Sequence, residues 1–373
     1  MSYALITLWH ERQRYLPGVL AVAFSALLIA LQCGLLLGLF SITSLPIDHN
    51  KAQLWMGATG VLSVDLGKPI PESYFTRLAS QAGVERTEDY FQGFSYWSKP
   101  DGGTELCMIV GSNLADDSLG GIAELTPEMR DLLSEPDAII VDESDLDRLG
   151  IHGVGDTAEI SGYQSRVVGL TRGVKSLAGP YVFCSRSTAA RRLRLPPEQA
   201  TYILAECETR GDGPEVVDRV RQRYNTISIF TKDDFSYRSR MHWLTKTKAG
   251  VALGCAAFLG LLVGAVVTYQ TLSAATRASM REYAVLRALG IPRLRMIVMV
   301  LWQSFWVGVI GVGLAIPTVH AIAWATEWSN LVRIELPWWV QVGATGITML
   351  MAMLSGVLSL RALKGIDPAV LLR

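Results

Sequence analysis

Four long apolar stretches set the architecture of this chain. They cover residues 16–42, 249–272, 296–324 and 338–360, and none of them contains Lys, Arg, Asp or Glu. A helix that crosses the hydrocarbon core of a bilayer needs about 20 apolar residues, whereas a buried helix of a soluble protein rarely runs so long without a charge. The pattern therefore predicts four transmembrane helices.

Residues 43–248, between the first two stretches, have the shorter periodicities of a folded α+β domain. The apolar runs at 138–142 and 165–170 are bounded by Gly, Asp and Ser, which predicts strands. Residues 69–83 and 213–224 predict helices, each with a Pro near its start.

A further helix is expected over residues 232–248, directly before the second apolar stretch. Thr231 stands at its N-cap and Asp234 at the capping-box position. Because no Gly or Pro interrupts residues 232–248, we expect a stalk helix that continues straight into the second span.

The first apolar stretch, residues 16–42, is too long for the apolar part of a signal peptide. The sequence SITSLPIDHN after it offers no convincing small-residue cleavage site, so a retained helix is expected. Residues 1–15 combine Leu, Ile and Trp with two arginines, which suits a short cytoplasmic interfacial helix. A frayed tail is the alternative.

The distribution of charge predicts the orientation, since short basic segments mark the cytoplasmic side of a membrane. Residues 1–15, 273–295 and 361–373 are rich in Lys and Arg, whereas residues 43–248 carry more acidic than basic residues. We therefore expect a multi-pass inner-membrane protein with both termini in the cytoplasm. The domain and the loop at 325–337 would be periplasmic. An outer aromatic belt would contain Trp324, Trp328, Trp338 and Trp339.

Composition and motifs argue against an enzyme. The chain is 50% hydrophobic, with a mean hydropathy of +0.28 and no net charge, and nothing indicates a nucleic-acid partner. Its five cysteines and five histidines lack metal-ligand spacing, so no metal, cofactor or catalytic residue is predicted. The sequence GLTRGVKS (169–176) departs from GxxxxGK[ST] and is interpreted as a turn. One disulfide among the external cysteines remains open, and these are Cys107, Cys184 and Cys207.

His320 lies inside the third span, near its outer end. A polar side chain in a membrane is a candidate functional residue. At this depth, however, a hydrogen bond to a neighbouring helix is the preferred interpretation.

The connector before the third span, ASMREYAVLRALGIPRLRM (278–296), is strongly charged. Residues 274–289 predict a cytoplasmic helix, Gly290 would end it in the left-handed conformation, and Pro292 can start the next helix. Glu282 has no basic residue three or four positions away, so no helical ion pair is open to it. An acid in a basic segment indicates a partner elsewhere.

Two motifs carry a resemblance to a known family. MREYAVLRALGIP and the ending RALKGIDPAVLLR resemble the signatures of FtsX/MacB-like ABC transporter permeases, of the type VII ABC superfamily. One span, a large external domain and three further spans resemble the family topology along the whole chain. The opening LITLWHERQRYLPGVLAVAFSALLIALQCGL and the segment LPIDHNKAQLWMG are similar to the DevC-type subgroup. Unlike MacB, this sequence has no ATPase motif.

The resemblance implies a fold and a set of partners. The fold would be an α-helical membrane protein with four transmembrane helices and a large α+β extracytoplasmic domain. That domain would contain a porter-like part (44–110 and 190–232) and a β-rich insert (111–189). The partners would be a second permease copy, two cytoplasmic ABC ATPase subunits that hold the ATP, a periplasmic membrane-fusion adaptor, an outer-membrane channel and membrane lipid. The coupling residues would be Arg281, Glu282, Tyr283, Leu286, Arg287 and Gly290.

The implied function is mechanotransmission: hydrolysis on the ATPase subunits would reshape the periplasmic domain and drive export of a lipid, glycolipid or amphiphile. Two alternatives remain open. One is extraction of lipoproteins or lipids of the LolC/LolE kind, and the other is regulation of a cell-wall hydrolase of the FtsX kind. The length of residues 43–248 suits an adaptor-docking porter better than the smaller FtsX domain.

Overall fold

The chain forms two compact units in the computed structural model. The helical unit joins Met1–Gly38 to Val251–Arg373, and the α/β unit is the intervening segment Leu39–Gly250. This division follows the sequence, because the polar domain is inserted between the first and second apolar stretches. The structure describes residues 12–176, 178–209, 211–278, 285, 289–328 and 334–359.

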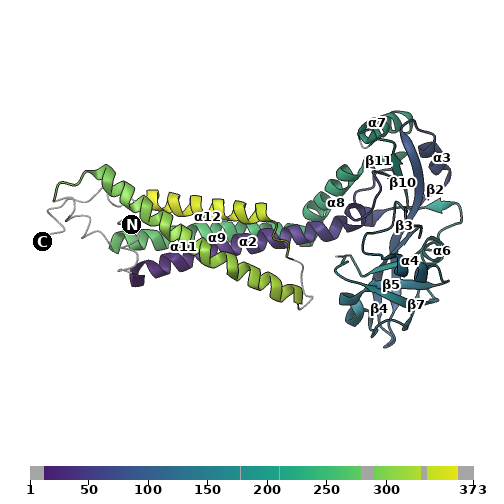
Figure 1. The fold of residues 1–373 in the computed structure, drawn as a ribbon, viewed down its shortest axis with the longest axis horizontal. Helices are drawn as coiled ribbons and strands as arrows, with labels where there is room; N and C mark the ends of the chain where they lie inside the picture. The colour runs from purple at the N-terminus through teal and green to yellow at the C-terminus, as the bar shows by residue number, and fades with distance from the viewer. Residues whose placement is uncertain are drawn as a thin grey trace. The chain divides into compact units, whose positions relative to one another are not determined.

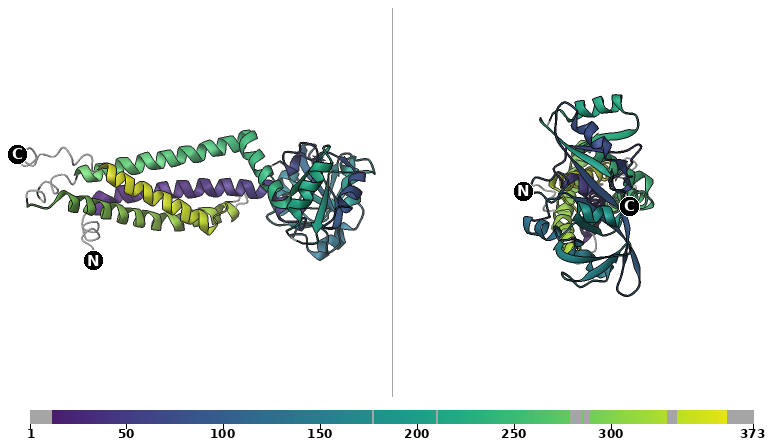
Figure 2. Two further views of the ribbon diagram at one scale, coloured as in Figure 1. Left: turned by 90° about the horizontal axis from the view of Figure 1, so that it is seen from above. Right: turned by 90° about the vertical axis from the view of Figure 1, so that its right-hand side faces the viewer.

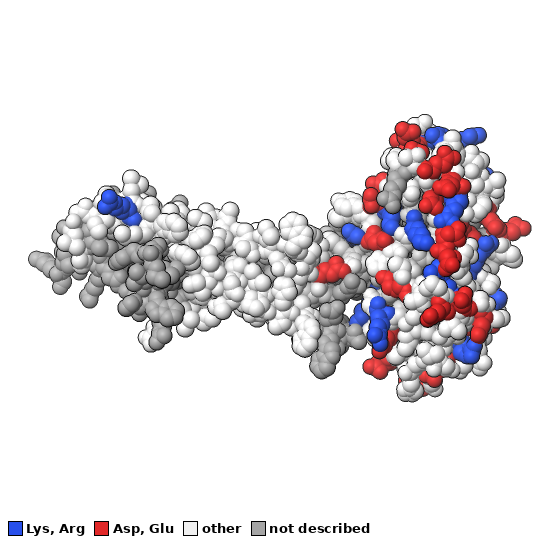
Figure 3. Space-filling view, viewed as in Figure 1, with Lys and Arg blue, Asp and Glu red and all other residues white. Residues whose placement is uncertain are grey.

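The described part of the helical unit contains α2 (Arg12–Asp48), α9 (Lys248–Ala278), α11 (Arg293–Trp328) and α12 (Trp338–Ser359) (Figure 1). Each of these helices is long and apolar enough to cross a membrane, so the four predicted stretches are indeed long helices. On the face drawn in Figure 3, charged side chains cover the α/β unit and are sparse on the helices. Such surfaces suit hydrocarbon rather than water.

Small residues bring the four helices into close contact. A Cβ added at Gly311 of α11 would lie 2.7 Å from Val22 of α2, so only glycine permits this approach. Ser25 of α2 lies 3.1 Å from the hydroxyl of Thr268 on α9, and its own hydroxyl donates to the Gly264 carbonyl at 3.1 Å. Close backbone approach and interhelical hydrogen bonds are how helices associate in a bilayer.

A nine-stranded mixed sheet organises the α/β unit, in the order β11-β1-β10-β3-β4-β8-β5-β7-β6. The long strand β3 also pairs with β6, so the six strands from β3 to β6 in this order form a closed circle of pairings. The strands are β1 (Leu54–Ala58), β3 (Val84–Ser98), β4 (Thr104–Ser112), β5 (Ala138–Asp142), β6 (Thr157–Ile160), β7 (Tyr163–Thr171), β8 (Tyr181–Ser185), β10 (Tyr202–Cys207) and β11 (Ile227–Thr231), with β2 (Ile70–Pro71) and β9 (Gln199–Ala200) paired separately.

Helices cover both faces of the β11-β1-β10-β3 part of the sheet. Leu54 and Met56 pack in one buried cluster with α3 and α7, whereas the alternate residue Trp55 faces a second cluster with Phe235 of α8. This alternation is the period of two of a strand. The helices described in the whole α/β unit, besides the end of α2 and the start of α9, are α3 (Ser73–Ala79), α4 (Pro127–Leu133), α5 (Leu146–Leu149), α6 (Arg186–Arg192), α7 (Gly213–Arg223) and α8 (Lys232–Lys246), with short 3₁₀ segments η1 (Val64–Leu66) and η2 (Glu143–Asp145).

Several predicted elements are confirmed. The runs at 138–142 and 165–170 lie in β5 and β7, and residues 213–224 correspond to α7. The predicted helix at 69–83 is shorter, because Ile70 and Pro71 pair with β9 and the helix covers only Ser73–Ala79. The turn predicted at residues 169–176 is confirmed only in part, because residues 169–171 belong to β7 and pair with β5, and an irregular loop follows over residues 172–176.

The predicted continuous stalk is wrong. Thr231 does cap α8 by accepting from the Asp234 amide at 3.3 Å, but α8 ends at Lys246 and α9 begins at Lys248. Thr247 between them is extended, with φ −97° and ψ 147°. The helix that continues without a break is α2, which extends beyond the predicted span to Asp48 (Figure 2). No proline marks the break in the sequence. There, the Thr247 hydroxyl accepts from the Gly250 amide at the start of α9.

Candidate functional site

Gly290 is the one predicted coupling residue within the described chain. Its φ is +84°, the left-handed conformation expected at a helix end. The Leu289 amide donates to the Val285 carbonyl at 3.0 Å, and α11 starts directly after Pro292. The turn therefore has the predicted geometry. The other predicted coupling residues lie outside the described residues, and they are Arg281, Glu282, Tyr283, Leu286 and Arg287.

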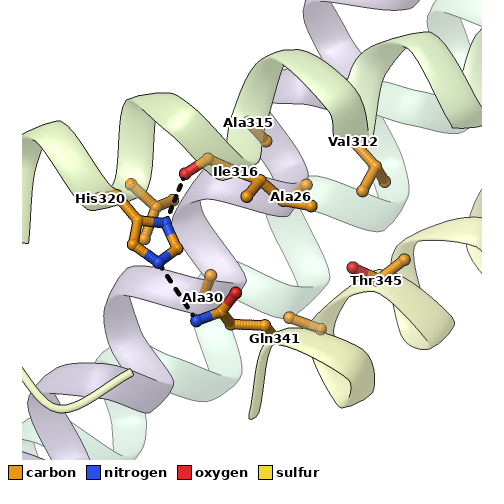
Figure 4. A pocket seen from close by; sticks show the side chains of 10 residues that line it. Ala26, Ala30, Val312, Ala315, Ile316, His320, Gln341 and Thr345 are labelled. Atoms are coloured by element: carbon orange, nitrogen blue, oxygen red, sulfur yellow. Dashed lines mark hydrogen bonds between the residues drawn. The ribbon is translucent and has the colours of Figure 1, made fainter. Parts of the chain in front are cut away.

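His320 on α11 lines a small cavity between α2, α11 and α12 (Figure 4). Its Nδ1 lies 2.9 Å from the Ile316 carbonyl, and its Nε2 lies 3.3 Å from Nε2 of Gln341 on α12. The Gln341 amide also donates to the Leu336 carbonyl at 2.9 Å. The predicted hydrogen bond between His320 and a neighbouring helix is thus confirmed.

These contacts assign the roles of the two ring nitrogens of His320. A carbonyl can only accept, so Nδ1 carries the proton, and Nε2 accepts from the amide of Gln341. The cavity has a volume of about 20 Å³ and is otherwise lined by apolar side chains and Thr345. That volume holds about one water molecule. The arrangement therefore joins two helices and leaves no space for a transported molecule.

A second polar cluster ties the end of α2 to α8 within the α/β unit. Arg240 on α8 donates from Nη2 to Oδ2 of Asp48 at 2.5 Å and from Nε to the Ser44 hydroxyl at 2.8 Å. The Ser44 hydroxyl in turn donates to Asp48 at 2.6 Å. Both helices lead from this unit toward a span. The cluster therefore connects the two chain segments by which any movement of the spans would reach the domain.

Asp65, in η1, is a carboxylate buried beneath α8. Its Oδ1 accepts from Nε2 of Gln92 on β3 at 3.2 Å, and its Oδ2 accepts from the indole Nε1 of Trp243 on α8 at 3.1 Å. Its residue exposure is only 4%, and both of these partners are neutral donors. The side chain thus joins α8 to the sheet through an acid that lacks a counter-charge among its hydrogen-bond partners.

Burial raises the pKa of Asp65 to about 7, while the hydrogen bond from Trp243 opposes this rise. Desolvation penalises the charged form of a carboxyl, and donors to the carboxylate favour it. The acid lies near the buried phenols of Tyr90 and Tyr202, and its charge contributes to the raised pKa of both. Asp65 therefore changes charge near neutral pH, at the contact that holds α8.

One face of α8 makes further contacts with the domain. Phe235 is fully buried and stacks on Phe230 with ring centroids 5.1 Å apart. The Val64 amide donates to the buried Ser239 hydroxyl at 3.1 Å, and Arg238 donates from Nε to the Val61 carbonyl at 3.0 Å. These contacts repeat every three to four residues, the spacing of one helix face. They fix α8 to the α/β unit.

A wide polar cavity in the α/β unit, about 760 Å³, does not select a ligand. Its two lysines already donate to backbone carbonyls: Lys51 to Asp116 at 2.9 Å and Lys232 to Asn50 at 2.6 Å. Acidic side chains line the same space, so its charge is balanced. Within the described residues no group of three or more His, Cys, Asp or Glu side chains could hold a metal ion. Three cysteines of the α/β unit are buried free thiols, namely Cys107, Cys184 and Cys207.

The polar contacts that hold α8 were not predicted from the sequence. The residues at positions 235, 239 and 243 are four apart, and this spacing could have identified the buried face of the helix. An acid within the apolar run VLSVDLG was a second signal, at Asp65. The pairing of Arg240 with Asp48 joins residues far apart in the chain, so no local pattern could predict it.

Parts of the chain resemble a protein family and two solved domains. Residues 254–368 match the family model described as FtsX-like permease C-terminal. No curated protein matches the chain. The solved periplasmic region of MacB from Actinobacillus actinomycetemcomitans is similar, with 12% identity, a TM-score of 0.35, and coverage of 51% of this chain and 94% of that one. The extracellular domain of the noncanonic ABC-type transporter YknZ from Gram-positive bacteria is also similar, with 12% identity, a TM-score of 0.31, and coverage of 48% and 98%.

Proposed function

Because the chain belongs to the FtsX/MacB-like family of ABC transporter permeases, we propose that it is the membrane subunit of an exporter driven by a separate ATPase. Permeases of this family work with a cytoplasmic ABC ATPase. The match over residues 254–368 carries the proposal, since it covers three of the four long helices and the connector between α9 and α11.

In the proposed mechanism, hydrolysis on the ATPase subunits moves the connector, and the spans transmit this movement to the α/β unit. The contact between Arg240 and Asp48 supports the proposal, because it ties together the two helices that lead to the spans. The four apolar stretches contain no Lys, Arg, Asp or Glu, so the spans lack the charged lining of a hydrophilic channel. The substrate would therefore be moved outside the membrane rather than through a pore between the helices.

The orientation and the partners are part of the same proposal. The basic connector supports a cytoplasmic location for both termini and a periplasmic location for the α/β unit. Exposed Trp324, Trp338 and Trp339, near the loop between α11 and α12, suit the outer interface. Two copies of the chain would assemble with two ATPase subunits, a periplasmic membrane-fusion adaptor and an outer-membrane channel, and export a lipid, glycolipid or amphiphile.

Reconstitution tests this function. The permease is expressed with a candidate partner ABC ATPase, purified, and placed in liposomes that contain fluorescent glycolipid. We expect copurification of the two proteins and ATP-dependent transfer of the glycolipid to the adaptor. Transfer of a lipoprotein instead would support extraction of the LolC/LolE kind. Activation of a cell-wall hydrolase without any transfer would support regulation of the FtsX kind and contradict export.

A further inference from the structure

An open cleft of about 430 Å³ lies at the carboxyl ends of two parallel strands in the α/β unit. Strands β4 and β8 pair in parallel, and Ser112 at the end of β4 stands opposite Ser185 at the end of β8. Both residues line the cleft, together with the start of α6 and residues 196–197. The volume lies in the range of ligand pockets, about 300 to 1,000 Å³.

The chain leaves these two strands on opposite faces of the sheet. Ile109 and Val110 are neighbours on β4, so their side chains point to opposite faces. After β4, Leu119 packs in the same buried cluster as Val110. After β8, Ala189 of α6 packs in the cluster that contains Ile109. A crevice therefore opens between the two connections, and α/β sheets bind their ligands in crevices of this kind.

The cleft is lined by polar groups, of which only Arg186 is charged. The guanidinium of Arg186 donates from Nε to Oδ2 of the buried Asp89 at 2.6 Å, so its charge is already balanced. Among the described residues that line the cleft, none is acidic. An ionic ligand would therefore lose its hydration without gaining a free counter-charge. The uncharged polar side chains are those of Ser112, Asn113, Ser187 and Gln199.

The start of α6 is fixed in place before any ligand binds. The Ser185 hydroxyl accepts from the Thr188 amide at 3.4 Å and so caps the helix. A Cβ added at Gly111 of β4 would lie 2.2 Å from Cβ of Ala189, so α6 packs closely on this strand. The Ser187 hydroxyl is thus presented from a rigid element, which reduces the conformational entropy that binding costs.

Apolar side chains complete the lining and restrict the ligand further. They belong to Phe91, Leu114, Ala190, Pro196 and Pro197. A hydrocarbon chain alone would leave the hydroxyl and amide groups of the cleft without partners. A sugar ring matches both kinds of group, because its C–H faces are apolar and the hydroxyls at its edges donate and accept hydrogen bonds.

We propose that this cleft binds an uncharged sugar ring. The hydroxyls of Ser112 and Ser187 and the amide of Gln199 would bond the ring hydroxyls, while Arg186 keeps its bond to Asp89. The proposal rests on the proposed function and narrows its substrate class to amphiphiles with a neutral sugar headgroup. A free glycan carries the same chemistry as such a headgroup, and the experiment separates these two sources.

Saturation-transfer NMR on the full chain in nanodiscs tests the site. The neutral probes are the methyl glycosides of glucose, galactose and mannose. We expect saturation transfer to at least one of them. The corresponding uronate and amino sugar should bind at least about tenfold more weakly, because burial of an unpaired charge costs free energy. Absence of transfer to all three neutral glycosides overturns the proposal, as does tighter binding of a charged counterpart.

Three variants locate the bound sugar. Ser187→Trp, at an exposed position of α6, should block the cleft and abolish the transfer. Ser80→Trp, at an exposed position that ends α3, is the matched control and should leave the affinity within about twofold. Gln199→Leu should weaken binding about two- to tenfold, the effect of one hydrogen bond. Unchanged binding in both Ser187→Trp and Gln199→Leu, or equal loss in Ser80→Trp, overturns the site.

A pair of probes identifies the source of the sugar. The octyl glycoside of the sugar that binds is compared, below its critical micelle concentration, with the methyl glycoside, and Ser187→Trp corrects for partition into the nanodisc. Affinity at least about tenfold higher for the octyl glycoside would identify an amphiphile, whereas equal affinity would identify a free glycan and contradict the narrowed substrate class. The measurements need no ATPase, so their failure would count against the cleft alone. A permease that binds the sugar without ATP-dependent glycolipid transfer would count against the proposed function.

Discussion

Replacing Asp65 by Asn should change how the stability of the α/β unit depends on pH. Burial raises the pKa of Asp65 from 3.8 to about 7, so the folded state binds a proton at a higher pH than the unfolded state does. The contribution of this group to stability is therefore complete below the unfolded pKa and is lost as the pH rises through about 7. The amide side chain of the Asp65→Asn variant does not titrate, so that variant has no such dependence.

The magnitude follows from the pKa. Each unit between the pH and the folded pKa is worth about 1.4 kcal/mol, so lowering the pH from about 8 to about 5 should stabilise the parent protein by about 3 kcal/mol relative to Asp65→Asn. The 4% exposure of Asp65 means that solvent screens this effect little. Carboxyl groups elsewhere titrate in both proteins and cancel in the difference.

The assay is urea unfolding of the full chain in mild detergent, followed by tryptophan fluorescence at several pH values. The difference in free energy of unfolding between the parent and Asp65→Asn should grow as the pH falls. Asp218→Asn, at an exposed position on α7, should show no comparable trend. Trp243→Phe removes the donor that favours the charged form, so the onset of stabilisation should move to higher pH. If this difference in the free energy of unfolding stays constant, or shrinks toward low pH, then the pKa of Asp65 is not raised in the folded state.

Three further predictions concern the connector, the cavity and the orientation. Glu282→Lys should abolish both copurification with the ATPase and export, because the new lysine would repel a basic partner. The control Arg295→Gln should keep the amount of copurified ATPase and the export rate within about twofold of the parent. A Glu282→Lys variant that still binds the ATPase and exports at the parent rate contradicts the role of that residue. His320→Leu should reduce export less than about twofold in the liposome assay, since His320 only joins helices, and complete loss of export would make it part of the transport path. In a cysteine-free chain, Asp101→Cys should react with a membrane-impermeant maleimide in intact spheroplasts, whereas Leu289→Cys should not react. Labelling of Leu289→Cys but not of Asp101→Cys would mean that the orientation is the opposite one.

The sequence predicted the parts of the fold that depend on local pattern. Uncharged apolar runs identified the four long helices, and the positive φ of Gly290 agrees with its predicted place at a helix end. The sheet order could not be predicted, because it depends on pairings such as that of β1 with β10 and β11, which are distant in sequence.

The break before α9 shows a different limit of local pattern. Thr247 is tolerated in a helix, and here its hydroxyl caps the start of α9 by accepting from the Gly250 amide. Helix propensity therefore favoured a continuous helix, whereas a local cap at Thr247 interrupts it. The coupling role of five connector residues stays a prediction, since they lie outside the described residues, and they are Arg281, Glu282, Tyr283, Leu286 and Arg287.

In the proposed mechanism, hydrolysis by a separate ATPase moves the α/β unit. A spin label at Glu208, an exposed position after β10, would report the distance between the two copies in a reconstituted permease–ATPase complex. Trapping the ATPase with ATP and vanadate should shift this distance in the parent complex. It should leave the distance unchanged in the complex that carries Glu282→Lys. An unchanged distance in a parent complex that hydrolyses ATP and exports its substrate would contradict mechanotransmission.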